Sequence, residues 1–251
     1  MIFEARTYRN SLSRERFQSF AIQQETADLW IGVDPNSFQD DMADVAVAAL
    51  RSALDELNAY GTANPLFKKS LKPCSVQDDA PAMIRHLAAA GEKAGVGPMA
   101  AVGGLLSETI GRALLENFSI GELVVENGGN LFVKLQDPLV LSIFAGESPL
   151  SGMAGMEVLP EQTPLGVCTF TQADKSPMDY GKADAVMIAC GDAVLADALT
   201  SGFGNRIKKP ADVENVLNRT ENVPEILAAV LVCDDQIGIR GEFELKLLTS
   251  E

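Results

Sequence analysis

This chain has very little histidine and no closely spaced cysteines. Its 251 residues include one histidine, His86, and four cysteines that lie far apart: Cys74, Cys168, Cys190 and Cys233. A single histidine excludes the common metal sites built from several histidines. The absence of a CxxC pair argues against a zinc ribbon or thioredoxin-type chemistry. We therefore expect buried, reduced thiols.

Basic residues are also scarce. The chain has 20 lysines and arginines against 35 aspartates and glutamates, a net charge of -15. Such a chain repels nucleic acid and anionic membranes, so neither is an expected partner. No apolar run of about 18 residues suggests a membrane span, and the first residues show no signal peptide, so we expect a cytoplasmic protein. A phosphorylated ligand would need local help from backbone N–H groups, a few cations or a metal.

Apolar residues make up 47% of the chain, which is enough for the core of a single domain over residues 1–251. Helical spacing predicts helices over residues 41–57, 80–90, 98–118, 192–201 and 211–217. Gly61 is expected to end the first helix, and residues 61–79 to form a loop. Strand patterns occur over residues 20–33 (a hairpin), 123–125, 131–133, 139–144, 166–171, 185–189, 229–233, 236–239 and 243–247. Hairpins and helices in blocks predict an α+β fold, with mostly antiparallel sheet and packed helices.

A glycine–proline pair opens the expected helix over residues 98–118. Pro98 suits the first helical position, and Gly97 before it allows a close backbone approach. Small residues follow on the first turns: Ala100, Ala101, Gly103 and Gly104. A bare helix start can receive a phosphate on its N–H groups. The alternative is a small-residue helix packed tightly on a sheet, in which Met99 belongs to the core instead of facing a ligand ring.

The residues Asn127-Gly128-Gly129-Asn130 stand between two strand patterns. Asn-Gly is a strong signal for a tight hairpin turn, and that alone explains the dipeptide. The functional alternative is that the glycine N–H groups and the two asparagine amides face a ligand.

Asp197 and Thr200 are three residues apart and share a helix face. A carboxylate and a hydroxyl suit Mg²⁺ shared with a phosphate, whereas the alternative is a solvated aspartate and a threonine bonded to its own helix. Lys182 either offers a cation to a phosphate or is a solvated charge. His86 is more typical of a surface histidine than of a catalytic one.

Four short motifs are fairly specific when their order and spacing are taken together. They are Gly97–Val102, Asn127–Asn130, Gly181–Ala185 and Leu195–Thr200. Further similar residues lie near the start, over 4–9 and 25–31. The set resembles the ApbE-like superfamily, most closely its short, soluble and largely uncharacterised branch.

The resemblance implies a T-fold-like α+β domain with an active-site crevice. The best-known members are FAD:protein FMN transferases, which bind FAD, use Mg²⁺ and move FMN onto a threonine of a partner protein. Asp197 and Thr200 match the metal-binding segment, and residues 127–129 match a flavin-contacting loop. With the chemistry above, the expected cofactor-binding residues are Gly97, Pro98, Met99, Asn127, Gly128, Gly129 and Lys182.

This chain departs from the transferases in one respect. They carry a His-Ile-x-Asp-Pro stretch upstream of the metal segment, where this chain has no histidine. A missing acid/base group would lower a rate by ~10²–10⁴-fold. Three functions stay open: an enzyme acting on a phosphorylated cofactor such as a flavin nucleotide with Mg²⁺, a non-catalytic binding or accessory protein, and a role in sulfide assimilation in which Cys168 handles sulfide. We expect the Gly97–Pro98 helix start, the Asn127–Asn130 turn and the 197–200 helix to meet at one crevice.

Overall fold

A computed structural model describes residues 16–25, 27–171 and 181–248. Within these residues the α-helices are α1 (Met42–Ala63), α2 (Pro65–Lys69), α3 (Ala82–Ala94), α4 (Val102–Asn117), α5 (Ala193–Gly204) and α6 (Val213–Arg219). The strands are β1 (Gln18–Gln24), β2 (Ala27–Val33), β3 (Leu123–Asn127), β4 (Asn130–Lys134), β5 (Leu139–Ser142), β6 (Ala154–Val158), β7 (Leu165–Thr171), β8 (Ala185–Cys190), β9 (Ile226–Cys233), β10 (Gln236–Gly241) and β11 (Leu245–Leu247).

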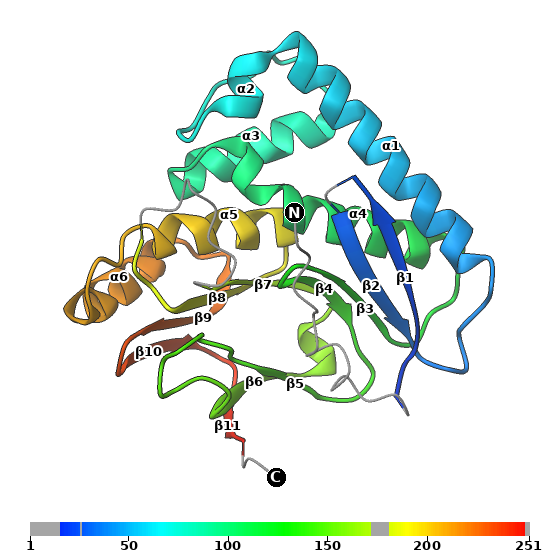
Figure 1. The fold of residues 1–251 in the computed structure, drawn as a ribbon. Helices are drawn as coiled ribbons and strands as arrows, with labels where there is room; N and C mark the ends of the chain where they lie inside the picture. Colours follow the sequence, from blue (N-terminus) through cyan, green and yellow to red (C-terminus); the bar gives the residue numbers. More distant parts are fainter. Residues whose placement is uncertain (1–15, 26, 172–180, 249–251) are drawn as a thin grey trace.

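The described elements form three layers. The middle layer is a sheet of order β1-β2-β3-β4-β7-β8-β9-β10, and the helices cover one of its faces (Figure 1). A small sheet of order β11-β6-β5 lies against the other face (Figure 1). Neighbouring strands in both sheets are antiparallel, which confirms the expected α+β class.

The central strands are buried on both faces because they lie between the helices and the small sheet. In β8, whose six residues are all buried, Val186, Ile188 and Cys190 join the cluster under the helices. Ala185, Met187 and Ala189 join the cluster that includes the small sheet. Successive side chains on a strand point to opposite faces, so this strand reads as an unbroken apolar run.

Three local expectations differ from the structure. Gly61 does not end α1, which continues to Ala63; the Lys68 side chain packs over the glycine, and a Cβ there would lie 3.2 Å from the Lys68 Cδ. Part of the expected loop forms α2, which is too short to show a periodicity. Strand β6, with Ala154 and Gly155 at its start, carries no strand signal of its own and is set by pairing with β5 and β11. Every helix in the described part of the chain is too short or too polar to cross a bilayer.

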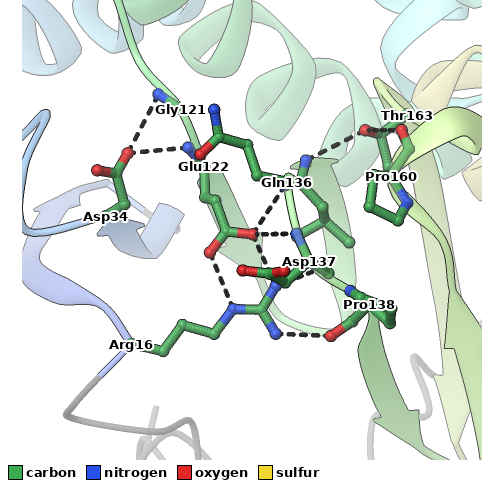
Figure 2. A network of polar contacts seen from close by, with 10 residues as sticks. Arg16, Asp34, Gly121, Glu122, Gln136, Asp137, Pro138, Pro160 and Thr163 are labelled. Carbon is green, nitrogen blue, oxygen red and sulfur yellow. Dashed lines mark hydrogen bonds and ion pairs between the residues drawn. The ribbon is translucent and has the colours of Figure 1, made fainter.

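A buried carboxylate ties the segment before β1 to the connection after β4. Glu122 is 5% exposed and accepts hydrogen bonds from Arg16 Nε at 2.9 Å and Arg16 Nη2 at 2.7 Å. The backbone N–H groups of Gln136 and Asp137 donate to the same carboxylate at 2.8 and 3.0 Å (Figure 2). Arg16 also donates to the carbonyls of Asp137 and Pro138, so both charged groups are fully engaged.

This network predicts a component of acid unfolding. Burial alone would raise the pKa of the Glu122 carboxyl, but the bonds from Arg16, Asp137 and Gln136 outweigh it and lower the pKa to about 2. The network's contribution to stability is therefore present above the unfolded pKa of 4.5 and is lost as the pH falls towards about 2. We expect Glu122→Gln to lower the free energy of unfolding by about 2–4 kcal/mol at neutral pH.

Urea unfolding at a series of pH values tests this expectation. The wild-type protein should lose up to about 1.4 kcal/mol per pH unit more than Glu122→Gln in that window. Glu116→Gln, an exposed carboxylate on α4, is the matched control and should behave as wild type. An identical acid dependence for wild type and Glu122→Gln would contradict the prediction.

Candidate functional site

The glycine–proline pair packs against the protein itself. The expected helix over residues 98–118 divides into a 3₁₀ turn, Pro98–Ala101, and helix α4. A Cβ on Gly97 would lie 1.9 Å from the Ser70 carbonyl oxygen, so the close approach at Gly97 is made by another backbone segment. Pro98 is buried, and Met99 packs against the cluster under the helices. A role for these residues in binding a cofactor stays a prediction.

The first turn of α4 packs its glycine backbone directly against α5. The Gly104 N–H donates to Asp197 Oδ2 at 2.8 Å. A Cβ on Gly104 would lie 2.2 Å from the Ala193 carbonyl oxygen, and one on Gly103 would lie 2.2 Å from Asn130 Nδ2 and 3.1 Å from Asp197 Oδ2. Only glycine allows α4, α5 and the start of β4 to approach this closely.

The turn between β3 and β4 lies beside these glycines. Gly128 and Gly129 have φ of 61° and 85°, as a tight turn with two positive-φ residues requires. The Asn127 side-chain amide donates to the Gly103 carbonyl at 3.4 Å. The hairpin is as expected, and the structure brings Asn127, Asn130 and Asp197 together at the start of α4. Ligand contacts of the turn stay a prediction.

The Asp197 carboxylate is the unusual charged group of this junction. It is 8% exposed, and this burial raises its pKa to about 7, although backbone N–H groups of Gly104 and Gly103 act to lower it. Near neutral pH the carboxyl therefore exists in comparable protonated and charged forms. A perturbed carboxyl beside two amide side chains is a candidate binding group for a ligand or cation.

Thr200 lies one turn further along α5 and faces the sheet. The residue is 2% exposed, and its hydroxyl donates to the carbonyl oxygens of Ala196 at 2.8 Å and Cys168 at 3.2 Å. The described residues contain no group of three or more histidine, cysteine or acidic side chains that could hold a metal. The metal binding expected of Asp197 and Thr200 stays a prediction that rests on one carboxylate and one hydroxyl.

Lys182 lies in the segment that leads into β8. It is exposed and precedes β8, and its backbone N–H donates to the Ile207 carbonyl at 2.7 Å. Its own carbonyl accepts the Cys233 thiol at 3.3 Å. Strand β7 lies between β4, which begins at Asn130, and β8, which follows Lys182. Its predicted contact with a phosphate is not tested by these contacts.

Carboxylates accept hydrogen bonds from the backbone N–H groups at the start of α5. Asp192 accepts the Leu195 N–H at 3.0 Å, and Glu108 from α4 accepts the Ala193 N–H at 2.8 Å. His86 from α3 bonds to Asp192 at 2.7 Å, and this bond raises the histidine pKa despite its partial burial. No role for the buried Glu108 was predicted from the sequence. The available signal was its position four residues after Gly104, which places the two residues on the same face of α4.

The Cys168 thiol lies beneath the junction. It is fully buried, donates to the Ala193 carbonyl at 3.5 Å, and has its pKa raised well above the usual value, first by burial and then by the charge of Asp197. The thiolate is the reactive form of cysteine, so this surrounding opposes nucleophilic sulfur chemistry.

Solved structures with this arrangement of helices and antiparallel sheet define the class of fold. The apo flavinyl transferase ApbE of Pseudomonas stutzeri matches with a TM-score of 0.60 and 13% identity, covering 94% of this chain and 96% of its own. The ApbE protein of Thermotoga maritima matches with a TM-score of 0.57 and 12% identity, covering 90% and 97%. The protein thus has an ApbE-like fold.

Sequence relatives define the family more narrowly. A family model described as "AbpE bacteria" matches residues 9–239. A UPF0280 protein of Methanocella arvoryzae is 36% identical over 189 residues, which are 74% of this chain and 75% of that protein. A UPF0280 protein of Methanocaldococcus jannaschii is 32% identical over 192 residues, or 74% and 77%. The chain belongs to this ApbE-like family, in the branch of the UPF0280 proteins.

The glycine contact between α4 and α5 predicts an unusual sign for one substitution. Glycine to alanine inside a helix ordinarily stabilises by up to about 1 kcal/mol. Gly104→Ala should instead lower the free energy of unfolding by about 1–3 kcal/mol, because its Cβ would overlap the Ala193 carbonyl. Gly191→Ala is the control, since its Cβ would meet nothing within 4 Å. Chemical denaturation measures both, and stabilisation by Gly104→Ala would refute the contact.

Thiol labelling provides a second test of the site. Cys74 is half-buried, whereas Cys168, Cys190 and Cys233 are buried. We expect a thiol reagent to modify Cys74 first in the native protein, and the other three only after unfolding. Peptide mapping of the labelled protein identifies the residue. Rapid native labelling of Cys168 would contradict the structure and favour the sulfide-handling alternative.

Proposed function

We propose that this protein binds a flavin nucleotide, assisted by Mg²⁺, where Gly103–Gly104, the Asn127–Asn130 turn and Asp197 meet. The observation that carries the proposal is the buried Asp197 carboxyl with its pKa raised to about 7. An acid in such a place costs stability when it is charged, which is typical of groups kept for binding or chemistry. Support for a flavin comes from the ApbE fold, since the Pseudomonas stutzeri neighbour is named a flavinyl transferase.

The available donors fit Mg²⁺ only when a ligand completes its coordination. Mg²⁺ is commonly held by one or two carboxylates together with substrate phosphates and water. Asp197 would supply the carboxylate and Thr200 a neutral oxygen. A nearby cation favours the charged carboxylate and would lower the Asp197 pKa from about 7. When bound, the ion would offset phosphate charge in an acidic chain.

The side-chain amides of the turn would orient the ligand. Asn127 and Asn130 are half-exposed beside Gly103, whereas the Gly129 N–H already donates to Glu126 Oε1 at 2.9 Å and the Gly129 carbonyl accepts the Thr169 N–H. Side-chain amides provide both donors and acceptors, so they can bind the edge of a polar ring without adding charge. Gly103 and Gly104 would leave no bulky side chain of α4 beside the ligand.

Binding without group transfer is the function that these residues support best. His86 is the only histidine of the chain, and it is bound to Asp192, five residues before Asp197 on α5. Five helical residues correspond to about 7.5 Å along the axis, so the imidazole belongs to the start of α5 and not to the Asp197 junction. The described residues around Asp197 offer no other imidazole for acid/base work.

Two other activities can be tested by simple experiments. Flavin transfer would place FMN on a threonine of a partner protein when FAD and Mg²⁺ are supplied. A sulfide-assimilation role would act through Cys168, whose burial opposes it. Mass spectrometry of candidate partner proteins detects the first, and the labelling of Cys168 described above decides the second.

Titration calorimetry with FAD tests the proposed binding. We expect the wild-type protein to bind FAD at least 10-fold more tightly with Mg²⁺ than without it. Asp197→Asn keeps the acceptor for the Gly104 N–H but removes the charge, so it should lose the Mg²⁺ dependence while staying folded. Asp55→Asn, an exposed aspartate on α1, should match wild type. Equal affinities under all conditions, or no binding by the wild type, would refute the proposal.

A further inference from the structure

A cavity of about 370 Å³ is lined by residues in or next to α3, α5 and α6. Figure 1 shows these helices in the layer that covers the large sheet. The apolar wall of the cavity consists of Leu199 and Phe203 from α5, with Val223. Leu199 is two residues from Asp197, which corresponds to about 200° around a helix. The cavity therefore lies on a different face of α5 from the Asp197 junction. Its volume is in the range of small-molecule sites.

Three basic side chains line the same cavity: Lys93, Arg206 and Arg219. This grouping stands out in a chain with 20 basic and 35 acidic residues. Lys93 forms an ion pair with Glu225. Among the described residues, neither arginine forms an ion pair with a carboxylate: Arg206 Nη2 donates to the Ala94 carbonyl at 3.1 Å, and Arg219 Nε donates to the Asn215 side chain at 3.1 Å.

The guanidinium groups of Arg206 and Arg219 are both exposed, and they lie close enough for the charge of one to act on the other. Burial lowers the pKa of Arg206, and the charge of Arg219 lowers it further. Arg206 also lies over the Phe203 ring, 5.3 Å from its centroid, so its planar group is held at the apolar wall. Like charges kept together beside an apolar surface are stabilised when an anion lies between them.

We propose that this cavity binds a phosphorylated small molecule that also carries an apolar, planar group, as a nucleotide does. The guanidinium groups of Arg206 and Arg219 would bind the phosphates, since their planar donor forks match phosphate oxygens. The planar group would lie on half-buried Val223 and on the small accessible parts of Leu199 and Phe203, which are 1% and 3% exposed, and the exposed Asn222 side chain adds a neutral polar partner. This site is separate from the proposed flavin site.

The same cations have a structural alternative. Lys93 and Arg219 lie in the last turns of α3 and α6, and Arg206 follows α5, where positive charge offsets the negative helix ends. If that were their whole role, removing one would destabilise the protein. If they instead await an anion, Arg219→Gln relieves repulsion and leaves the stability of the ligand-free protein equal or higher.

Titration calorimetry with ADP, adenosine and pyrophosphate tests the proposal on the full-length chain. ADP should bind at least 10-fold more tightly than either adenosine, which lacks the charge, or pyrophosphate, which lacks the planar group. Arg206→Gln and Arg219→Gln should each weaken ADP binding about 10-fold or more. Arg51→Gln, an exposed arginine on α1, is the matched control and should bind as wild type.

The possible outcomes either support or overturn this site, and they distinguish it from the flavin site. ADP binding that is lost in Asp197→Asn but kept in both arginine variants would overturn the proposal, because the nucleotide would then occupy the other site. No ADP binding by the wild type, or destabilisation of ligand-free Arg219→Gln with unchanged ADP affinity, would overturn it too. Equal affinity for pyrophosphate and ADP would refute the role of the apolar wall. Arginine-dependent ADP binding without FAD binding would support this site and reject the flavin proposal.

Discussion

The candidate site depends on the close approach of α4, α5 and β7 at a single backbone position. Ala193 begins α5 and lies between Gly104 on one side and Gly166 on the other; a Cβ on Gly104 would lie 2.2 Å from its carbonyl oxygen, and one on Gly166 would lie 2.3 Å from its Cα. Because neither neighbour has a side chain, the helices and the sheet pack backbone to backbone. This packing brings the Gly104 N–H within hydrogen-bonding distance of Asp197.

Electrostatics at the helix ends follow from the same packing. The N–H groups that begin α4 and α5 are directed to Asp197, Asp192 and Glu108, so protein carboxylates already take the positions that an incoming anion would need. The acidic side chains of this protein thus satisfy N–H groups at the starts of α4 and α5. A phosphorylated ligand must then rely on a metal at Asp197 or on cations, and the grouped cations that lie at a cavity are those beside the C-terminal ends of α3, α5 and α6.

Most of the fold was predictable because its signals are local. In the β1–β2 hairpin large apolar residues recur at every second position, Asn127-Gly128 marks the β3–β4 turn, and the helices show a regular apolar spacing. Helix α2 and strand β6 were not predictable, since their short segments form only against neighbouring elements. The candidate site was predictable in part: its motifs are in the sequence, but the contact of Gly104 with Asp197 spans 93 residues and has no local signal.

The composition of α5 explains how one helix would serve the two proposed sites. All its residues except Ser201 are buried, and small residues such as Ala196 and Gly202 let neighbours approach from several sides; a Cβ on Gly202 would lie 2.5 Å from the Ala94 carbonyl oxygen. A helix enclosed in this way is fixed in position, so Asp197 on one face and Phe203 on another are held in a constant relation. The cations of the cavity were not predictable, because Lys93, Arg206 and Arg219 come from three segments that only this packing brings together.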